Sequence, residues 1–327
     1  MREVVAGVWA LRLPLQGHTI GHVNAYAVVD DGRVVLIDCG WLQPGSLELL
    51  ERCLSKFGAR LTDVEKVLLT HAHADHCGLA GELQRRHGAE VTMHNLDAGS
   101  LQHRYSNIAV LRDATEAWLA AVGAPRAVHA TAIRQVENGT EQVSLFEPDV
   151  AIEDGWTLTH GPFHIRAIHT PGHTPGHLCY FESSERLLFT GDTILPRINY
   201  SATFRPLSSS NPLAEHERSL ARLARLDARL GLPGHQDIFA DPTARIRDLL
   251  VRRRARSAEV LDLLAAGSAT AWEIAARTRR RRPWGEVVDT ARLSAVGETM
   301  AYLIHLEGVG HVEHDSVSAT WRLCARR

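Results

Sequence analysis

Leu68-Leu-Thr-His-Ala-His-Ala-Asp-His76 joins a short apolar run to a dense cluster of side chains that bind metal ions. The run at residues 67–69 is typical of a buried strand. In an extended segment, residues i and i+2 point the same way, so His71 and His73 would share one face just past the strand. A lone histidine is more often a satisfied core or surface residue, but three imidazoles and a carboxylate within six residues are hard to explain by packing. The stretch therefore predicts a metal site.

A second cluster of histidines occurs in the stretch His169-Thr-Pro-Gly-His-Thr-Pro-Gly-His177. Its two Pro-Gly pairs force turns that would present His173 and His177 from a loop between two apolar runs, 165–168 and 178–181. A purely structural loop would need the glycines and prolines but not three histidines.

Two shorter signals follow in the chain. A strand is predicted from Arg186 and ends in Gly191-Asp192, which places a carboxylate at the end of the strand. Leu232-Pro-Gly-His235 again puts a histidine after a Pro-Gly turn. A Gly-Asp pair taken alone is an ordinary turn, so it supports a metal site only in combination with the other motifs.

In this order, the motifs resemble those of the metallo-β-lactamase superfamily in its dinuclear hydrolase form. The resemblance covers residues 20 to 240 and implies an α+β fold, an αββα sandwich with the metals at one edge of the two sheets. It implies that His177 lies outside the ligand set. The ligands that it implies are His71, His73 and His173 for one metal and Asp75, His76 and His235 for the other, with Asp192 bridging the two.

The chemistry of these side chains agrees with that implication. Imidazole-rich sites without thiolate favour zinc, with iron or manganese as alternatives, so two Zn²⁺ ions are expected. Two cations about 3.5–4 Å apart would lower the pKa of a shared water from 15.7 toward about 7, giving hydroxide that attacks a carbonyl or phosphoryl centre. The electron-transfer branch of the superfamily typically has glutamate where this chain has His73, which favours hydrolysis over redox chemistry. A mononuclear sulfur-dioxygenase role remains a minor alternative.

The catalytic candidates beside the metals are Asp75, Arg197 and Tyr200. Related hydrolases often use a residue from the loop after the bridging aspartate to grip the substrate, which would suit Arg197 and Tyr200. The alternative is that both are ordinary surface residues. A glycine-flanked loop that holds His18 and His22 is either a connector or a flap over the pocket.

The remaining pattern predicts two domains. The first is a catalytic domain over residues 1–240. It is predicted to contain strands at 23–29, 34–38 and 90–94, a helix at 46–57, a helical insertion at about 96–136, and a helix with leucines at 220, 223, 226 and 230. Residues 241–327 predict helices at 242–266 and 291–306, a short helix opened by a capping box at Thr270, and a terminal strand pair. This order resembles a winged-helix domain, which an endoribonuclease-like group of the superfamily also carries.

Charge and composition limit the classes of molecule that the protein is expected to bind. The net charge of −2 argues against a globally basic nucleic-acid binder, although residues 241–327 hold 15 arginines against 11 acidic residues. The runs Arg252–Arg256 and Arg279–Arg282 could contact nucleic acid, but the helix expected to read a groove has only Arg292 as a basic residue. The preferred function is hydrolysis of a small acyl compound, an ester, thioester or lactone; the alternative is a single-strand endoribonuclease. A binding protein without chemistry is disfavoured because no ligand position is missing.

The five cysteines form no CxxC pair, which predicts reduced thiols. The first residues lack the pattern of a signal peptide, and no run approaches the roughly 18 apolar residues of a membrane span. A cytoplasmic protein without membrane association is expected, and the sequence leaves a homo-oligomer open.

Overall fold

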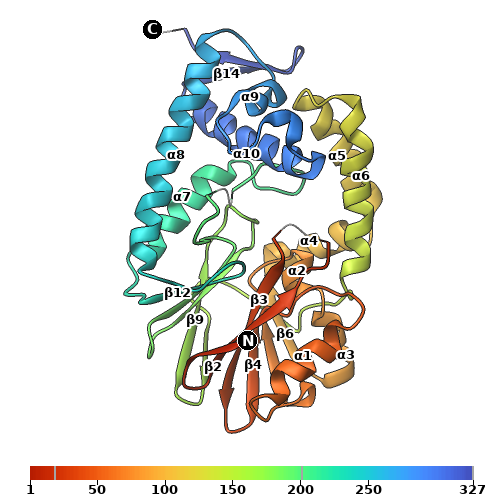
Figure 1. Ribbon diagram of the computed structural model, residues 1–327, viewed down its shortest axis with the longest axis vertical. Coiled ribbons are helices and arrows are strands. Elements are labelled where there is room, and N and C mark those ends of the chain that lie inside the picture. Colours follow the sequence, from red (N-terminus) through yellow and green to blue (C-terminus); the bar gives the residue numbers. More distant parts are fainter. Residues whose placement is uncertain (18–19, 200–201, 326–327) are drawn as a thin grey trace.

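A computed structural model describes residues 1–17, 20–199 and 202–325 (Figure 1). Its centre is formed by two β-sheets that lie face to face. The first sheet follows chain order: β1 (Arg2–Val5), β2 (Val8–Pro14), β3 (His22–Asp30), β4 (Arg33–Ile37), β5 (Val64–Leu68), β6 (Glu90–His94) and β7 (Val150–Ile152). The second has the order β13 (Phe239–Ala240), β12 (Leu230–Pro233), β11 (Leu187–Gly191), β10 (Leu178–Glu182), β9 (Phe163–His169) and β8 (Thr157–His160).

Strand direction sets which ends of the strands meet. Strands β1 to β4 are antiparallel, whereas β4, β5, β6 and β7 run parallel to one another. In the second sheet only β11 and β12 are parallel. The carboxyl ends of β4, β5 and β6 therefore share one edge of the first sheet, and those of β11 and β12 share one edge of the second.

Side chains from the facing strands fill the space between the sheets. Val28 and Ile37 of the first sheet belong to one buried cluster with Ile165 and Phe189 of the second. Because alternate residues of a strand point to opposite faces, Leu68 joins this inner cluster while its neighbour joins the cluster under the outer helices.

Helices cover the outer face of each sheet. Against the first sheet pack α1 (Ser46–Ser55) and α3 (Ala80–His87), with the one-turn helix α2 (Ala74–Cys77) between them in the chain. Against the second pack α7 (Pro212–Leu223) and α8 (Pro242–Ala265), whose leucines and isoleucines cover β9 to β11. These layers confirm the predicted α+β fold with its αββα sandwich.

The predicted helical insertion is present as three helices between β6 and β7. They are α4 (Asn95–Tyr105), α5 (Ile108–Ala121) and α6 (Arg126–Gly139). Three 3₁₀ turns complete the helical elements of the described residues: η1 (Leu61–Asp63), η2 (Thr140–Gln142) and η3 (Trp284–Glu286).

The C-terminal segment also has the elements expected of it. After α8 come α9 (Ala271–Arg277), α10 (Asp289–Gly308) and the antiparallel pair β14 (Val312–Asp315) and β15 (Thr320–Leu323). The capping box opens α9: the Glu273 amide donates to Thr270 Oγ1, and the Thr270 amide donates to the Glu273 carboxylate. The elements are confirmed, and their grouping into a winged-helix domain stays a prediction.

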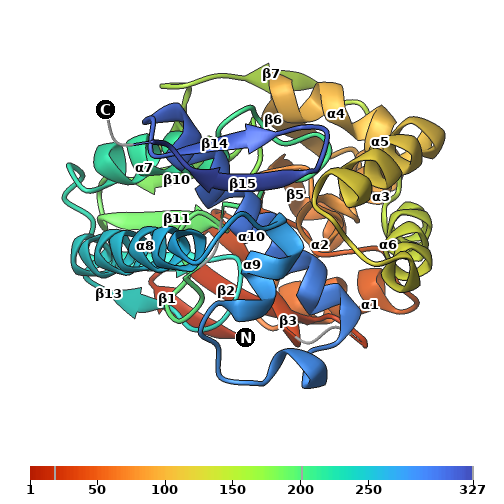
Figure 2. The same cartoon turned by 90° about the horizontal axis from the view of Figure 1, so that it is seen from above.

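Figures 1 and 2 show that α5, α6, α9 and α10 lie side by side at one end of the sandwich. Their apolar side chains form a single buried cluster, which includes Trp118 and Leu119 of α5 and Ile274 of α9. The insertion and the C-terminal helices thus share a core, although about 130 residues of chain separate them.

One predicted helix was too long. The leucine spacing predicted a helix through residue 230, but α7 ends at Leu223, and Leu230 is the first residue of β12. Leu230 pairs in register with Leu187 of β11, so it belongs to a parallel strand. The spacing of an apolar residue does not show whether a helix or a strand buries it. Here a short loop separates Leu230 from the helix whose leucine spacing it continues.

All five cysteines are free thiols, four of them buried. Within the described residues, no helix is both long and apolar enough to cross a membrane.

Candidate metal centre

The predicted ligands come from segments that follow β5, β9, β11 and β12, at the edge where these strands end. His71 and His73 follow β5, and His76 lies in α2, for which His73 is the N-terminal capping residue. His173 lies in the turn between β9 and β10, Asp192 directly follows β11, and His235 follows β12 by two residues. The structure brings all seven side chains together, as the resemblance to the family implied.

Three imidazoles converge at one side of the site. His71 Nε2 lies 2.9 Å from His73 Nδ1, and His173 Nε2 lies 3.0 Å from the same Nδ1 atom. Burial and the neighbouring histidines hold the pKa values of His71 and His73 well below the usual range. Both rings are therefore neutral, which is the form that binds a metal ion.

A second group adjoins the first. Asp75 Oδ2 lies 3.2 Å from His235 Nε2 and 3.8 Å from His76 Nε2. Asp192 is shared: its Oδ1 is 3.5 Å from His76 Nε2, and its Oδ2 is 3.4 Å from His235 Nε2 and 3.6 Å from His173 Nε2. The first group offers three nitrogen donors, the second offers nitrogen and oxygen donors, and Asp192 forms a third set with His71 and His76; each set could hold one cation.

Unsatisfied buried atoms test whether these residues fit a metal. His76 Nε2 and Asp192 Oδ1 are buried and have no hydrogen-bond partner among the described residues. Burial alone would lower the pKa of His76, but Asp38, Asp75 and Asp192 raise it to about 9. Burial alone would raise the pKa of Asp192, but the histidines hold it well below its usual range. A cation between these atoms would satisfy both, so the donor set fits a metal centre.

The far nitrogen of several rings is held by a second partner. His76 Nδ1 lies 2.7 Å from Asp38 Oδ2, His235 Nδ1 lies 2.8 Å from the carbonyl oxygen of His22, and His71 Nδ1 lies 2.9 Å from Thr70 Oγ1. Such contacts orient the ring and leave the other nitrogen free for a metal. His22 therefore contributes its backbone carbonyl, whereas His18 lies outside the described residues.

Two buried aspartates at the site were missed in the sequence. Asp38, at the carboxyl end of β4, accepts the Thr70 amide at 2.8 Å in addition to its contact with His76. Asp97, in the first turn of α4, accepts the Ala72 amide at 2.8 Å and the Gly176 amide at 2.6 Å. The position of Asp38 at the end of a buried strand was the one available signal, and Asp97 had none.

His177 lies outside the three groups of side chains that could hold a metal among the described residues. Its Nε2 accepts the Asp192 amide at 3.2 Å, and its Nδ1 lies 2.9 Å from Thr170 Oγ1 and 3.0 Å from Thr193 Oγ1. Burial and His173 hold the pKa of His177 well below its usual value, so the ring is neutral. Its position fixes the backbone of Asp192.

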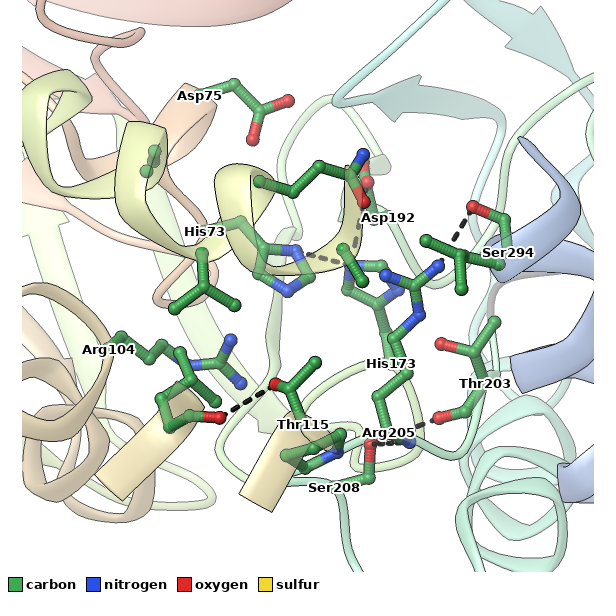
Figure 3. A pocket seen from close by; sticks show the side chains of 18 of the residues that line it. His73, Asp75, Arg104, Thr115, His173, Asp192, Thr203, Arg205, Ser208 and Ser294 are labelled. Atoms are coloured by element: carbon green, nitrogen blue, oxygen red, sulfur yellow. Dashed lines mark hydrogen bonds and ion pairs between the residues drawn. The ribbon is translucent and has the colours of Figure 1, made fainter. Parts of the chain in front are cut away.

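A cavity of about 510 Å³ opens onto this cluster (Figure 3). His73, Asp75, His173, Asp192 and His235 form one wall. Apolar and polar side chains from α4, α5, α6, α10 and the loop before α7 form the others, among them Arg104, Leu111, Trp118, Val136, Arg205, Leu293 and Ser294.

Arg197 does not lie where its predicted role requires. Its guanidinium pairs with Asp237 at 2.9 Å, its side chain is 66% exposed, and it is not among the described residues that line the cavity. The expectation that Arg197 grips the substrate therefore loses its geometric basis, because an ion pair turns it to the surface. The arginine that lines the cavity from this loop is Arg205. Tyr200 lies outside the described residues.

Comparisons with known proteins agree with this geometry. The family model of the metallo-beta-lactamase superfamily matches residues 18–235. A solved metallo-beta-lactamase family protein from Thermus thermophilus has a TM-score of 0.85 at 28% identity, over 98% of this chain and 100% of that one. The probable metallo-hydrolase YqjP of Bacillus subtilis is 23% identical over 96% of this chain and 95% of its own length.

Two further relatives match part of the chain. The probable polyketide biosynthesis zinc-dependent hydrolase BaeB of Bacillus velezensis is 31% identical over 54% of this chain and 57% of its own. The atrochrysone carboxyl ACP thioesterase of Aspergillus fumigatus is 29% identical over 38% of each chain. Since the family model spans the segment that supplies every side chain of the metal centre, the chain belongs to the metallo-beta-lactamase superfamily and is a metal-binding hydrolase.

Proposed function

We propose that this chain is a dinuclear zinc hydrolase of a small ester, thioester or lactone. The observation that carries the proposal is the position of Asp192, whose two carboxylate oxygens lie 3.5 Å from His76 Nε2 and 3.6 Å from His173 Nε2. It can therefore contribute to both groups of donors. The ligand assignment that we propose is His71, His73 and His173 for one ion, Asp75, His76 and His235 for the other, and Asp192 between them.

Bound there, two zinc ions would lower the pKa of a shared water to near 7 and polarise the substrate carbonyl. The protein positions the reacting groups. His177 fixes the backbone of Asp192 and Asp38 fixes the ring of His76, so neither donor needs to reorganise. Asp75 lines the cavity as an ionised carboxylate, because His76 and His235 outweigh the effect of its burial on the pKa. Because its pKa is held low it is a weak base, so the role that we propose for Asp75 beside metal binding is to orient the attacking water by accepting a hydrogen bond from it.

The walls of the cavity support an acyl substrate. Leu111, Trp118, Val136 and Leu293 give it an apolar surface that suits an acyl chain. Two of the relatives are described as a thioesterase and a polyketide biosynthesis hydrolase, which is the same class of chemistry.

Part of each arginine run has partners within the protein, which weakens the support for the endoribonuclease alternative. Arg252 pairs with Asp248 at 2.8 Å, Arg256 pairs with Glu259 at 2.7 Å, and the Arg280 guanidinium lies 4.5 Å from the ring centroid of Trp284. These three guanidinium groups are used within the protein, which reduces the basic face that the runs could offer to a nucleic-acid backbone.

Metal analysis coupled to a substrate panel tests the proposal. We expect two zinc ions per chain, and turnover of a thioester or lactone that chelation removes and added zinc restores. His73→Ala should reduce kcat/KM at least about 10³-fold, because three donors no longer surround the first ion. The panel includes β-lactams and a labelled RNA. Cleavage of the RNA that disappears in His73→Ala, with no acyl turnover, would reverse the choice of substrate class.

A further inference from the structure

Arg205 differs in its surroundings from Arg245 and Arg292. It lines the metal-site cavity, where its Nη2 donates to Ser294 Oγ at 3.1 Å and its Cζ lies 5.9 Å from the ring centroid of Trp118. Within the described part of the chain, no carboxylate lies within 4.0 Å of its guanidinium. Arg245 and Arg292, by contrast, pair with Asp248 and Asp289.

The positive charge of Arg205 has no acidic partner to offset its partial removal from water. Burial lowers the pKa of Arg205 to about 10, and no acidic side chain offsets this effect. The guanidinium is still charged at neutral pH, so the cavity wall carries a half-buried cation without an acidic partner. A half-buried charge that lines a cleft without an acidic partner is a candidate for ligand binding, because a bound anion would offset the cost of its partial desolvation.

The geometry leaves donors available for such an anion. A guanidinium has five N–H donors in a planar fork, and the hydroxyl of Ser294 uses one of them. Figure 3 shows the Arg205 side chain extending from Ser208 toward Ser294, inside the cavity that the metal-site residues also line. Arg104 belongs to the metal end, since its charge helps to lower the pKa of His73, and its Nε donates to Ser100 at 3.3 Å.

We propose that Arg205, positioned by Ser294, binds a carboxylate or phosphate group of the substrate at a distance from the scissile carbonyl. The substrate class is then an acyl ester or thioester that carries an anionic group, with the apolar walls of the cavity holding the carbon chain between the two ends. The reaction in this statement rests on the proposed acyl hydrolase function, whereas the anion subsite does not. The anion could belong to the acyl part or to the leaving group.

Two matched pairs of thioesters distinguish these sources. The first compares glutaryl with pentanoyl thioesters of the neutral thiol N-acetylcysteamine, so that only the acyl part gains a carboxylate. The second compares pentanoyl thioesters of 4′-phosphopantetheine and pantetheine, so that only the leaving group gains a phosphate. The readout is the ratio of kcat/KM for the anionic and neutral member of each pair, measured on the zinc-loaded enzyme.

We expect the wild-type ratio to exceed about 10 in one pair, as charge-assisted hydrogen bonds provide. Arg205→Met should bring this ratio close to 1, and Arg205→Lys should keep part of it. Ser294→Ala should lower the ratio less than Arg205→Met. Arg225→Met is the matched control, because Arg225 is exposed just past α7, does not line the cavity, and its loss changes the net charge equally. A ratio near 1 in both wild-type pairs, or a ratio that survives in Arg205→Met, would overturn the proposal.

A binding measurement separates the subsite from the reaction. Calorimetric titration of the zinc-loaded protein compares dicarboxylates of four to eight carbons with monocarboxylates of equal length, which present the same single carboxylate to the metals. One dicarboxylate should bind at least about 10-fold tighter than its partner in the wild type but not in Arg205→Met. This result without any acyl turnover would keep the subsite and reject the hydrolase. Turnover without any preference for the anionic thioester in the kinetic pairs, and without any preference for the dicarboxylate in the titration, would keep the hydrolase and reject the subsite.

Discussion

Asp38 is the residue on which the orientation of His76 depends. It is buried, and its Oδ2 lies 2.7 Å from His76 Nδ1. Asp38→Asn preserves the shape and tolerates the left-handed backbone of φ 59°, but it removes the charge. We expect zinc affinity to fall about 10–100-fold, because a second partner of this kind aligns the ring and raises its basicity.

Competition with a chromophoric chelator measures this affinity. Asp227→Asn is the control, since Asp227 is an exposed aspartate that pairs with Arg186 in the segment between α7 and β12. If Asp38→Asn bound zinc as tightly as the wild type, Asp38 would serve the fold and not the metal.

The buried imidazole of His216 should make the free energy of unfolding depend on pH. Its Nε2 donates to the Thr193 carbonyl at 2.8 Å, and its Nδ1 accepts from the guanidinium of Arg253. Burial and the charge of Arg253 hold the pKa of His216 well below its usual value. The ring cannot take a second proton in the folded state, but in the unfolded chain it does so near pH 6.5.

The unfolded state therefore binds one more proton than the folded state below pH 6.5, and the free energy of unfolding must fall as the pH falls. The contribution is about 1.4 kcal/mol per pH unit. Denaturant titrations at pH 7 and pH 5.5 should show a smaller loss in His216→Gln than in the wild type, by about 1 kcal/mol. Parallel losses in the two proteins would mean that His216 is protonated in the folded state.

Asp97 connects three structural elements. It joins α4 to the loop that holds His71 and His73 and to the loop that holds His173. It accepts the amides of Ala72 and Gly176 and, at 2.7 Å, the hydroxyl of Thr174. Asp97→Ala would leave three buried donors unpaired. We expect the free energy of unfolding to drop by about 3 kcal/mol or more, and zinc affinity to drop with it.

Asp97→Asn should give an intermediate value, because its amide oxygen can still accept one of the three bonds. Denaturation of the zinc-loaded and the chelated protein separates the two effects. A loss of stability confined to the zinc-loaded form would show that Asp97 acts on the metal alone and does not join the loops.

The elements also show how far sequence reasoning reaches. The histidine motifs were recognisable because several metal-binding side chains stand close together in the sequence just past apolar runs, and their convergence into one site was implied by the resemblance to the family. Asp97 and Arg205 were not, because their contacts depend on how α4 and the loop before α7 lie against distant segments. The prediction of a helix through Leu230 was wrong for a related reason. Leu230 lies in a buried strand after a short loop, but its distance from the leucines of α7 happens to match helical spacing.

For the whole molecule, the question is whether the insertion and the C-terminal helices unfold together. Trp118 and Leu119 of α5 share a buried cluster with Ile274 of α9, and the Trp272 amide donates to the Val122 carbonyl at 2.9 Å. The predicted boundary at residue 240 would divide this cluster. Because α5, α6 and α10 also form walls of the cavity, the shared core would set the shape of the substrate site.

Ile274→Ala tests this coupling. Ile274 is fully buried, so the cavity left by the substitution should cost about 2–5 kcal/mol. Hydrogen exchange should then rise in α5, although α5 lies about 150 residues away in the chain. Leu83→Ala is the control, since Leu83 is equally buried but belongs to the cluster under α1 and α3. Selective exchange in α5 with Ile274→Ala alone would establish one cooperative unit across the boundary. Unchanged exchange in α5 would mean that residues 1–240 and 241–327 are separate domains, so the cavity would lie at an interface free to open.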